Sequence, residues 1–594
     1  MNILTLLQKR FDQALAALVP DAEARKKYVA MIKQSQGDRF GDYQANCAMS
    51  LKKEVGGDPR QIAAEIVKRL KIDDMCEPPE IAGPGFINVT IKADWLAEQL
   101  RKIAADDRLG VEPIVGPKTF VVDFSSPNIA KSLHVGHLRS TIIGDALARL
   151  LRFLGHKVIT DNHLGDWGTQ FGTLIYGYKH FLDKNAFEKE PLKELERLYK
   201  LVQGMKKLKV EDADEEPSAD PVEMACREET AKLHAGDLQN NALWRMFIPH
   251  CLVDLNKMYE RLDVHFDNTL GESFYQPLLA GVVKSLDDKG ITVISNGAKV
   301  IVFGEDSRSV VQKQDGAFTY MTTDLATIQY REQQWSPNEI LYVVDFRQAA
   351  HFQKLFNAAC RWGYDKVQLH HISFGSVLAK DGKPMKTREG ENISLVALLD
   401  EAEERAKQAY EANTKERMER GDEVPQLTAE EQQQIATTVG LGAVKYADLS
   451  QNRTSNYKFD WDKMLAMDGN TATYMQYAYA RNKSILKKGN TDSAALRTLL
   501  PKLILSTSYE RALALQLLRF EEALQAAAGE FLPHLLTSYL WDLAKCYSGF
   551  FVNCPVLKAE TPELKNSRLL LCDLTARVIR QSLQLLGIET VERM

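Results

Sequence analysis

The clearest alternation of hydrophobic and polar positions lies in the segment from residue 118 to residue 170. The extended, mostly apolar segment 120–124 has the length of a buried strand, and a second strand is predicted at 157–161. Between them, apolar residues recur at helical spacing across 133–153, and Gly155 stands where a helix would end. A strand, a helix and a second strand in this order predict a right-handed crossover in a parallel, doubly wound sheet. The helical positions are Leu138, Ile142, Ala146, Leu147 and Leu150.

Residues 1–115 show the patterns of a separate α+β domain. Asp58 followed by Pro59 is a typical helix start, and the apolar residues after it give that helix one buried face. A strand is predicted at 85–91, after a Gly-Pro turn, and 110–117 has the composition of a linker. The opening segment MNILTLLQKRFDQALAAL carries charges within its apolar periodicity, so we expect an amphipathic helix and not a signal peptide.

Residues 118–390 are predicted to form the α/β domain, with two insertions. Residues from about 175 to 240 have a helical and highly charged pattern, and we expect their acidic centre, 211–217, to be solvated. Residues 268–318 show strand-like alternation, most clearly in Lys299–Phe303. We therefore interpret both segments as insertions that lie outside the parallel sheet.

The sheet pattern resumes at 340–344 and ends in Asp345, at the strand end where ligands of such folds bind. Residues 391–594 are rich in Ala, Leu, Gln and Glu and predict an all-α domain, interrupted by a charged linker near 413–426. From residue 441 onwards there are 19 Lys and Arg against 15 Asp and Glu, a net charge of +4 within a chain of net charge −5. This last third is therefore the better candidate for meeting phosphates.

Composition limits the class of protein. The chain has 594 residues, 45% of them hydrophobic and 26% charged, which is typical of a globular protein with several domains. No apolar run approaches the roughly 20 residues that span a bilayer, so we expect no membrane association. The eight cysteines include no CxxC pair, which favours free thiols in a reducing compartment and predicts a cytoplasmic protein.

The run His134-Val135-Gly136-His137 opens the predicted helix directly after a strand. Exposed N–H groups and the helix dipole favour a phosphate at such a position, and a glycine admits a flat group against the backbone. Imidazole N–H groups can then donate to the oxygens of a reacting phosphate. Two other interpretations stay open from this run alone: a pair of metal ligands, or a helix start that merely tolerates polar residues.

The stretch VVDFSSPNIAKSLHVGHLRST, followed by NHLGDWGTQFG at 162–172, resembles the active-site opening of the class I aminoacyl-tRNA synthetases. Within that class it is most similar to the arginyl-tRNA synthetases, and HVGH stands where the class has its HIGH motif. The resemblance implies a Rossmann-type catalytic domain with insertions, an N-terminal α+β domain that contacts tRNA, and a C-terminal all-α anticodon-binding domain. It implies ligation of L-arginine to tRNA(Arg) through an arginyl-adenylate, by an enzyme that usually works as a monomer.

The resemblance assigns ATP and the chemistry to two segments. His134, Gly136 and His137 would bind ATP, with both histidines and the nearby Lys131 stabilising the reacting phosphates. The segment KPMKT places Lys383 and Lys386 at the spacing of the class's KMSKS loop, although its sequence is degenerate. Whether Lys131 or Lys386 stabilises the leaving pyrophosphate stays open, and a solvated turn is the alternative for 383–387. Mg²⁺ is expected as the counter-ion of ATP, with no protein-bound metal.

The amino-acid pocket implied by the resemblance uses carboxylates, because a planar guanidinium is held by paired hydrogen bonds. Asp123 and Asp324 would hold the guanidinium, with Tyr320 packed against it. Asn128 would contact the amino-acid end of the substrate, and Gln348 would make a further substrate contact. A strand-end aspartate that caps a turn and a tyrosine in a core are the structural alternatives.

Candidate tRNA contacts come from both ends of the chain. Tyr474 and Tyr477 are aromatic residues interleaved with cations, a pattern that suits stacking on unpaired bases. The resemblance adds the terminal Met594 at the anticodon loop, and Phe86 and Asn88 at the D-loop. Core packing is the alternative for the tyrosines. Two other functions are weighed: a HIGH-type nucleotidyltransferase for another small acid, and a non-catalytic tRNA-binding relative.

Overall fold

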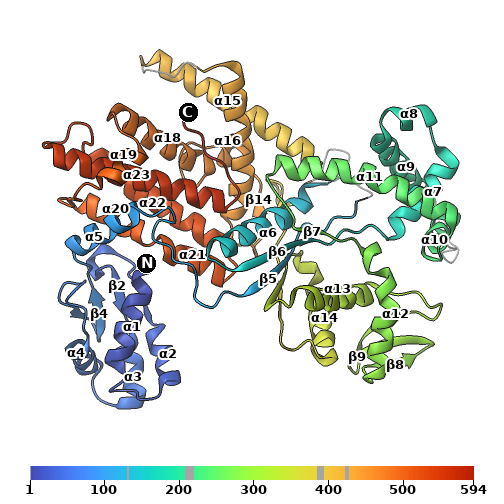
Figure 1. The fold of residues 1–594 in the computed structure, drawn as a ribbon, viewed down its shortest axis with the longest axis horizontal. Helices are drawn as coiled ribbons and strands as arrows, with labels where there is room; N and C mark the ends of the chain where they lie inside the picture. The colour runs from blue at the N-terminus through green and yellow to red at the C-terminus, as the bar shows by residue number, and fades with distance from the viewer. Residues whose placement is uncertain (1, 130–132, 208–219, 384, 386–392, 422–426) are drawn as a thin grey trace.

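The computed structural model describes residues 2–129, 133–207, 220–383, 385, 393–421 and 427–594. Its N-terminal part, blue in Figure 1, has a four-stranded antiparallel sheet of order β1-β2-β4-β3 packed with helices, as predicted. This part lies against the C-terminal helices, where Arg511 contacts Asp42 at 2.6 Å and the Tyr43 hydroxyl donates to Glu522 at 2.7 Å. Its elements are α1 (Ile3–Leu15), α2 (Ala22–Val29), β1 (Ile32–Gln34), β2 (Tyr43–Ala45), α3 (Cys47–Val55), α4 (Pro59–Arg69), β3 (Glu80–Ala82), β4 (Phe86–Val89) and α5 (Ala93–Ala104).

The central sheet has five parallel strands in the order β12-β11-β5-β6-β7. The predicted strand–helix–strand unit is confirmed as β5 (Thr119–Asp123), α6 (Val135–Phe153) and β6 (Lys157–Asn162). β11 (Glu339–Tyr342) and β12 (Gln368–His371) lie on the other side of β5. Strand order therefore reverses between β5 and β11, and this is the point where doubly wound sheets form a ligand crevice.

Alternate residues of the sheet face two different cores. Val122 and Leu341 belong to the core that contains α6, whereas Val121 and Ile340 belong to a core with the helices of the opposite face. Both faces are thus covered, as a parallel sheet requires. The opposite face is covered by α12 (Glu272–Asp288), α13 (Tyr320–Trp335) and α14 (Ala349–Trp362), and α13 and α14 are drawn below the sheet in Figure 1.

The first predicted insertion is helical, and its acidic centre lies outside the described residues. The prediction that residues 268–318 form a second insertion outside the parallel sheet is partly wrong. β7 (Asn268–Thr269) belongs to the main sheet, and the helix α12 follows it. Only a three-stranded antiparallel sheet of order β10-β9-β8 stands apart from the central sheet. The elements are α7 (Thr169–Phe181), α8 (Lys184–Lys189), α9 (Pro191–Lys207), α10 (Pro221–His234), α11 (Leu238–Arg261), β8 (Thr292–Ser295), β9 (Ala298–Gly304) and β10 (Ser307–Gln312).

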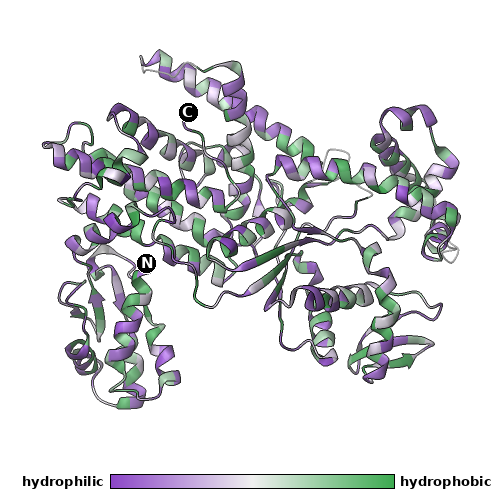
Figure 2. Ribbon diagram, in the orientation of Figure 1, coloured by the Kyte–Doolittle hydropathy of each residue, from purple (hydrophilic) through white to green (hydrophobic). Residues whose placement is uncertain are grey.

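The C-terminal part is helical as predicted, except that α15 continues to Glu419 where a linker was expected. One short strand, β14 (Tyr457–Lys458), pairs in parallel with β13 (Val377–Leu378). Most helices carry hydrophobic and hydrophilic residues side by side (Figure 2), and within the described ranges no helix is long and apolar enough to cross a membrane. The helices are α15 (Leu395–Glu419), α16 (Ala429–Leu449), α17 (Trp461–Met464), α18 (Ala472–Lys488), α19 (Ser493–Leu499), α20 (Ser508–Leu518), α21 (Phe520–Gly529), α22 (His534–Asn553) and α23 (Pro562–Leu585).

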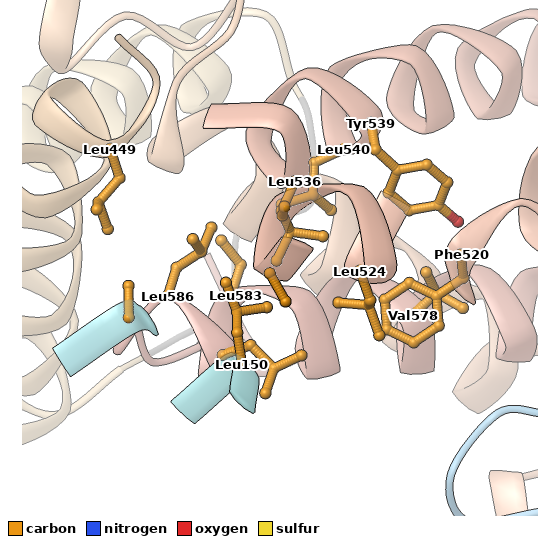
Figure 3. Close-up of a cluster of buried hydrophobic side chains, with 14 of the residues drawn as sticks. Leu150, Leu449, Phe520, Leu524, Leu536, Tyr539, Leu540, Val578, Leu583 and Leu586 are labelled. Carbon is orange, nitrogen blue, oxygen red and sulfur yellow. The ribbon is translucent and has the colours of Figure 1, made fainter. Parts of the chain in front are cut away.

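The helix that begins at HVGH packs directly onto this C-terminal part. Figure 3 shows Leu150 of α6 beside Leu583 and Leu586, within a cluster that includes Leu524 and Leu536. Burial of such side chains contributes roughly 1.5–3 kcal/mol each. The large apolar contact therefore places α6 between the sheet and the helical part, and fixes the direction in which its N-terminus points.

Candidate active site

Two loops meet at the carboxyl end of the sheet, where strand order reverses. The chain leaves β5 at Asp123 and passes through 124–134 to α6, and it leaves β11 towards the 3-10 turn η2 (Phe346–Gln348). Asp123 is the register partner of Tyr342 on β11, so the two strand ends are adjacent. The predicted strand-end residues Asp123 and Asp345 therefore lie at the expected crevice.

The turn after β5 is strained and firmly held. Ser125 and Ser126 have φ of +67° and +45°, a left-handed conformation that costs non-glycine residues about 1–3 kcal/mol each. The N–H of Ser125 donates to the Ser140 hydroxyl at 2.8 Å, and the Ser126 hydroxyl donates to Oδ1 of Asp123 at 2.8 Å. Strained residues of this kind are common at functional sites, and here they form the turn through which the chain passes from β5 towards the HVGH segment.

The two histidines cap their own helix. Nδ1 of His134 accepts the N–H of Gly136 at 3.0 Å, and Nδ1 of His137 accepts the N–H of His134 at 3.1 Å. A neutral imidazole that accepts through Nδ1 carries its proton on Nε2, so both rings have a distal N–H donor. A Cβ at Gly136 would lie 2.8 Å from the His134 ring, which explains the glycine between them. Among the described residues, no group of three or more His, Cys, Asp or Glu could hold a metal.

The start of α6 is also tied to the helical part. The N–H of Val135 donates to the carbonyl of Ile393 at 3.1 Å, and the N–H of Leu395 donates to the carbonyl of Leu133 at 3.0 Å. His134 and Ser394 form the corresponding antiparallel bridge. The first residues of α15 therefore help to fix the position of the HVGH segment.

The predicted lysines are only partly within the described residues. Lys383 is exposed in a turn, where its carbonyl accepts the N–H of Ala379 at 2.8 Å and Gly382 has φ of +82°. Lys131 and Lys386 lie outside the described residues. Lys380, just before this turn, is paired with Asp460 at 3.0 Å, so β13 and the segment after β14 support the base of the turn.

The predicted pocket residues Tyr320 and Asp324 lie one helical turn apart at the start of α13. Residues at this spacing share one face of a helix, and Tyr320 is 67% exposed above the half-buried Asp324. His351 of α14 contacts Asp324, with 2.6 Å between Nε2 and Oδ2, and this hydrogen bond raises the pKa of His351. Gln348 is exposed in η2, which leads directly into α14.

Glu272, which the sequence patterns did not single out, completes a group of carboxylates. It begins α12 and lies near Asp166 and Asp324. Burial, followed by repulsion from these two carboxylates, raises the pKa of Glu272 to about 7. Gly271 before it has no room for a side chain, because a Cβ would lie 2.2 Å from Asp166. A cation between Glu272 and Asp324 would relieve this repulsion.

Asp123 was predicted to hold the substrate guanidinium together with Asp324; in this structure it pairs with the chain's own Arg331, and its contact with the substrate stays a prediction. Its Oδ2 accepts from Arg331 at 2.6 Å, while Oδ1 accepts from Ser126. Asn128 is exposed, and its side-chain oxygen Oδ1 would be 2.0 Å from a Cβ at Gly165, so only a glycine at 165 leaves room for this side chain. Asp123 at the end of β5 and Asn128 in the loop after it thus lie on one segment of the chain, and Tyr320 and Asp324 lie on one helix.

Two of the predicted tRNA contacts share a cavity. Tyr477 and Met594 line a space of about 480 Å³ between α15, α16 and α18, together with Tyr410 and Arg417. Arg481 lies over the Tyr477 ring at 4.5 Å and donates to its hydroxyl at 2.7 Å. Tyr474 instead packs against Trp541, with ring centroids 5.8 Å apart, outside this cavity.

The two N-terminal candidates differ in exposure. Phe86 is half-buried at the start of β4, beside Gly83, where a Cβ would lie 3.2 Å from its ring. Asn88 is 5% exposed, and its side-chain oxygen accepts from Gln44 at 2.8 Å within the sheet. Asn88 thus faces its sheet neighbour in this structure, and its contact with tRNA stays a prediction.

Comparisons with known proteins cover the whole chain. Three family models match: "Arginyl tRNA synthetase N terminal domain" at 5–91, "tRNA synthetases class I (R), catalytic domain" at 99–461, and "DALR anticodon binding domain" at 475–594. An arginine–tRNA ligase of Rhodopirellula baltica is 44% identical, with both chains fully covered. The arginyl-tRNA synthetase structure from Plasmodium falciparum has a TM-score of 0.81 at 29% identity, with both chains fully covered. That from Thermus thermophilus has 0.79 at 26%, covering 99% of this chain and 100% of its own.

Proposed function

Because this chain belongs to the arginyl-tRNA synthetase family, it joins L-arginine to tRNA(Arg) for translation with ATP as a substrate, and we propose that it does so through an arginyl-adenylate formed at the carboxyl edge of the central sheet. The observation that carries the proposal is the placement of HVGH across the sheet edge from the carboxylates of Glu272 and Asp324. One side suits phosphates, and the other suits a guanidinium. A substrate lying between them would bring its carboxylate to the α-phosphate of ATP.

The first step needs alignment and positive charge more than a base. The carboxylate oxygen of arginine attacks the α-phosphate, the bond from that phosphorus to the bridging oxygen breaks, and pyrophosphate leaves with the electron pair. The distal N–H groups of His134 and His137 would donate to the phosphate oxygens as charge develops. Lys383 belongs to the same proposal, with Lys131 and Lys386, and Mg²⁺ would accompany ATP as its counter-ion. In the second step a ribose hydroxyl oxygen of the tRNA attacks the carbonyl carbon of the arginyl-adenylate. The bond from that carbon to the phosphate oxygen breaks, AMP leaves with the electron pair, and the hydroxyl proton is released.

Specificity for arginine rests on carboxylates that a guanidinium can bridge. Glu272 and Asp324 are the pair that we propose for the guanidinium, with Tyr320 packed against it and His351 orienting Asp324. Asp123, Asn128 and Gln348 would complete the pocket towards the amino-acid end. A smaller or neutral side chain would leave buried charge unpaired, and such losses discriminate strongly.

The helical part is the proposed site of the tRNA anticodon loop. The cavity lined by Tyr477, Arg417 and Met594 combines an aromatic ring with a cation, which suits an unpaired base. Tyr474 and the N-terminal residues Phe86 and Asn88 remain in the proposal as further contacts. We also propose a monomer that works in the cytoplasm, and sedimentation with and without tRNA would test its oligomeric state.

Aminoacylation of bulk tRNA with each of the twenty amino acids, with and without ATP, tests the function directly. Charging with arginine alone, and only with ATP, is the expected result. Charging with another amino acid would overturn the pocket assignment while leaving the chemistry in place. Binding of tRNA without any charging would favour a non-catalytic tRNA-binding protein.

The KM for arginine should fall as pH rises through about 7. The substrate guanidinium keeps its charge across this range, whereas Glu272 is neutral below its pKa of about 7 and offers no ionic partner there. Linkage predicts up to about tenfold in KM per pH unit on the acidic side and a plateau above neutrality. Protonated His351 competes for Asp324 and acts in the same direction.

The control for this pH profile is Glu272→Gln, which keeps the size of the side chain and removes its titration. We expect a higher KM for arginine and a flatter profile, while the KM for ATP follows the wild-type profile. A Glu272→Gln profile as steep as that of the wild type would assign the pH dependence to another group. The variant His351→Asn then measures how much of the pH dependence of the KM for arginine comes from His351.

A further inference from the structure

A fully buried guanidinium lies beneath the proposed arginine pocket. Arg331 of α13 is 0% exposed, and its Nη2 contacts Oδ2 of Asp123 at 2.6 Å and Oδ2 of Asp161 at 2.9 Å. Its Nε adds a second bond to Asp161 at 3.1 Å. Asp123 and Asp161 are register partners at the ends of β5 and β6, so Arg331 joins two neighbouring strands of the sheet.

Stability alone does not account for this group. Two buried carboxylates share one cation, and in the described part of the chain Nη1 of Arg331 and Oδ1 of Asp161 have no hydrogen-bond partner. Apolar side chains of similar volume commonly stabilise a core as well as or better than such an ion group. Stability is therefore not enough to explain why a buried ion group with unpaired atoms is present here. The elements that Arg331 joins offer a further explanation.

Arg331 is connected to both walls of the pocket. On one side, Asp123 links Arg331 to Ser126, because the Ser126 hydroxyl donates to Oδ1 of Asp123 at 2.8 Å. The backbone of Ser126 is strained, with φ of +45°. On the other side, Arg331 is part of α13, the helix that begins with Tyr320 and Asp324. One guanidinium thus fixes the distance between the strained loop and the helix that presents the pocket carboxylate.

We propose that Arg331 is a positioning residue for the amino-acid substrate, an internal guanidinium that locks α13 and the Ser126 turn against the ends of β5 and β6. It also fills the space between Asp123 and Asp161, so that the cationic side chain of the substrate is directed to Glu272 and Asp324. The inference rests on the proposed function, because it takes the α13 face as the arginine pocket. The proposed site of ATP is the HVGH segment, with which Arg331 makes no hydrogen bond or ion pair in the described part of the chain.

The test compares Arg331→Lys with Arg568→Lys in the full-length protein. Arg568 is a matched control in the helical part: it is buried, pairs with Glu510 at 2.8 Å and donates to the carbonyl of Pro555 at 2.9 Å. Both substitutions keep the positive charge and lose the guanidinium fork. For Arg331→Lys we expect the KM for arginine to rise about 10- to 100-fold, with the KM for ATP within about twofold of wild type. Arg568→Lys should lower Tm without changing the KM for arginine.

A purely structural role would lower Tm in both variants and leave the ratio of the two KM values unchanged, which would overturn the proposal. If Arg331→Lys does not fold, Asp161→Asn serves as the second variant, because it keeps an acceptor for Arg331 and removes one charge. A selective rise in the KM for arginine, by about threefold or more, is then expected. Equal changes in both KM values would overturn the proposal there too.

Failure of the inference and failure of the proposed function give different results. Asp324→Asn reports on the pocket itself. If Asp324→Asn raises the KM for arginine and Arg331→Lys does not, the pocket stands and the role of Arg331 is wrong. If neither variant changes the KM for arginine while the wild type still attaches arginine to tRNA, the arginine pocket is elsewhere. Both the pocket assignment and the role of Arg331 are then wrong.

Discussion

Replacing Asp324 with asparagine is expected to raise the KM for arginine about 30-fold or more while the KM for ATP changes little. The substitution preserves the shape of the side chain and removes the charge that we propose faces the substrate guanidinium. Loss of one partner from a desolvated, hydrogen-bonded charge pair costs about 2–5 kcal/mol, and each 1.4 kcal/mol is about tenfold in affinity. Steady-state aminoacylation, with each substrate varied in turn, measures both constants.

The control for Asp324→Asn is Glu332→Gln, a loss of carboxylate charge on the same helix, α13. Glu332 is eight positions further along, and neither a hydrogen bond nor an ion pair of its side chain is found in the described structure with any pocket residue. It should leave both KM values close to those of the wild type. Equal loss of arginine and ATP affinity in Asp324→Asn would show that the residue holds the fold of the site and does not bind the guanidinium.

The parts of the fold that were predicted correctly depend on local patterns. The periodicity from Phe120 to residue 161 is enough to place β5, α6 and β6, because each has one hydrophobic face or a buried run. β7 was missed since a strand of two residues, Asn268–Thr269, has no periodicity to detect. The end of α15 was missed because its last turns are charged on all sides and resemble a linker.

The residues of the candidate site can likewise be separated into those that a local sequence pattern indicates and those that only the fold brings together. HVGH is visible in the sequence because one short segment supplies the helix start, the caps and the glycine. Glu272 is an acidic residue in the first turn of a helix, a common position with a capping explanation of its own. Its proposed role can be inferred only from the fold, which brings Asp166 and Asp324 close to it. Arg331 and Asp123 are 208 positions apart, and no local pattern connects them.

His137→Asn is expected to lower kcat for arginine activation about 10²–10³-fold without a comparable change in the KM for arginine. The asparagine side-chain oxygen stands near the position of Nδ1, so it can accept the N–H of His134 and keep the cap. It has no group at the position of Nε2, which is the proposed donor to the phosphate. His134→Asn makes the same separation, because Nδ1 of His134 accepts the N–H of Gly136.

Helix capping by itself would give a different result. A lost cap costs about 0.5–2 kcal/mol of stability, so a capping role predicts a lower Tm for His137→Ala and recovery of both Tm and kcat in His137→Asn. Thr428→Ala removes the cap of α16, where Thr428 accepts from Glu431 at 3.2 Å, and serves as the control for cap loss alone. Full activity in both asparagine variants would therefore show that the histidines act only as helix caps. A low kcat at wild-type Tm would instead support donation from their distal N–H groups to the reacting phosphate.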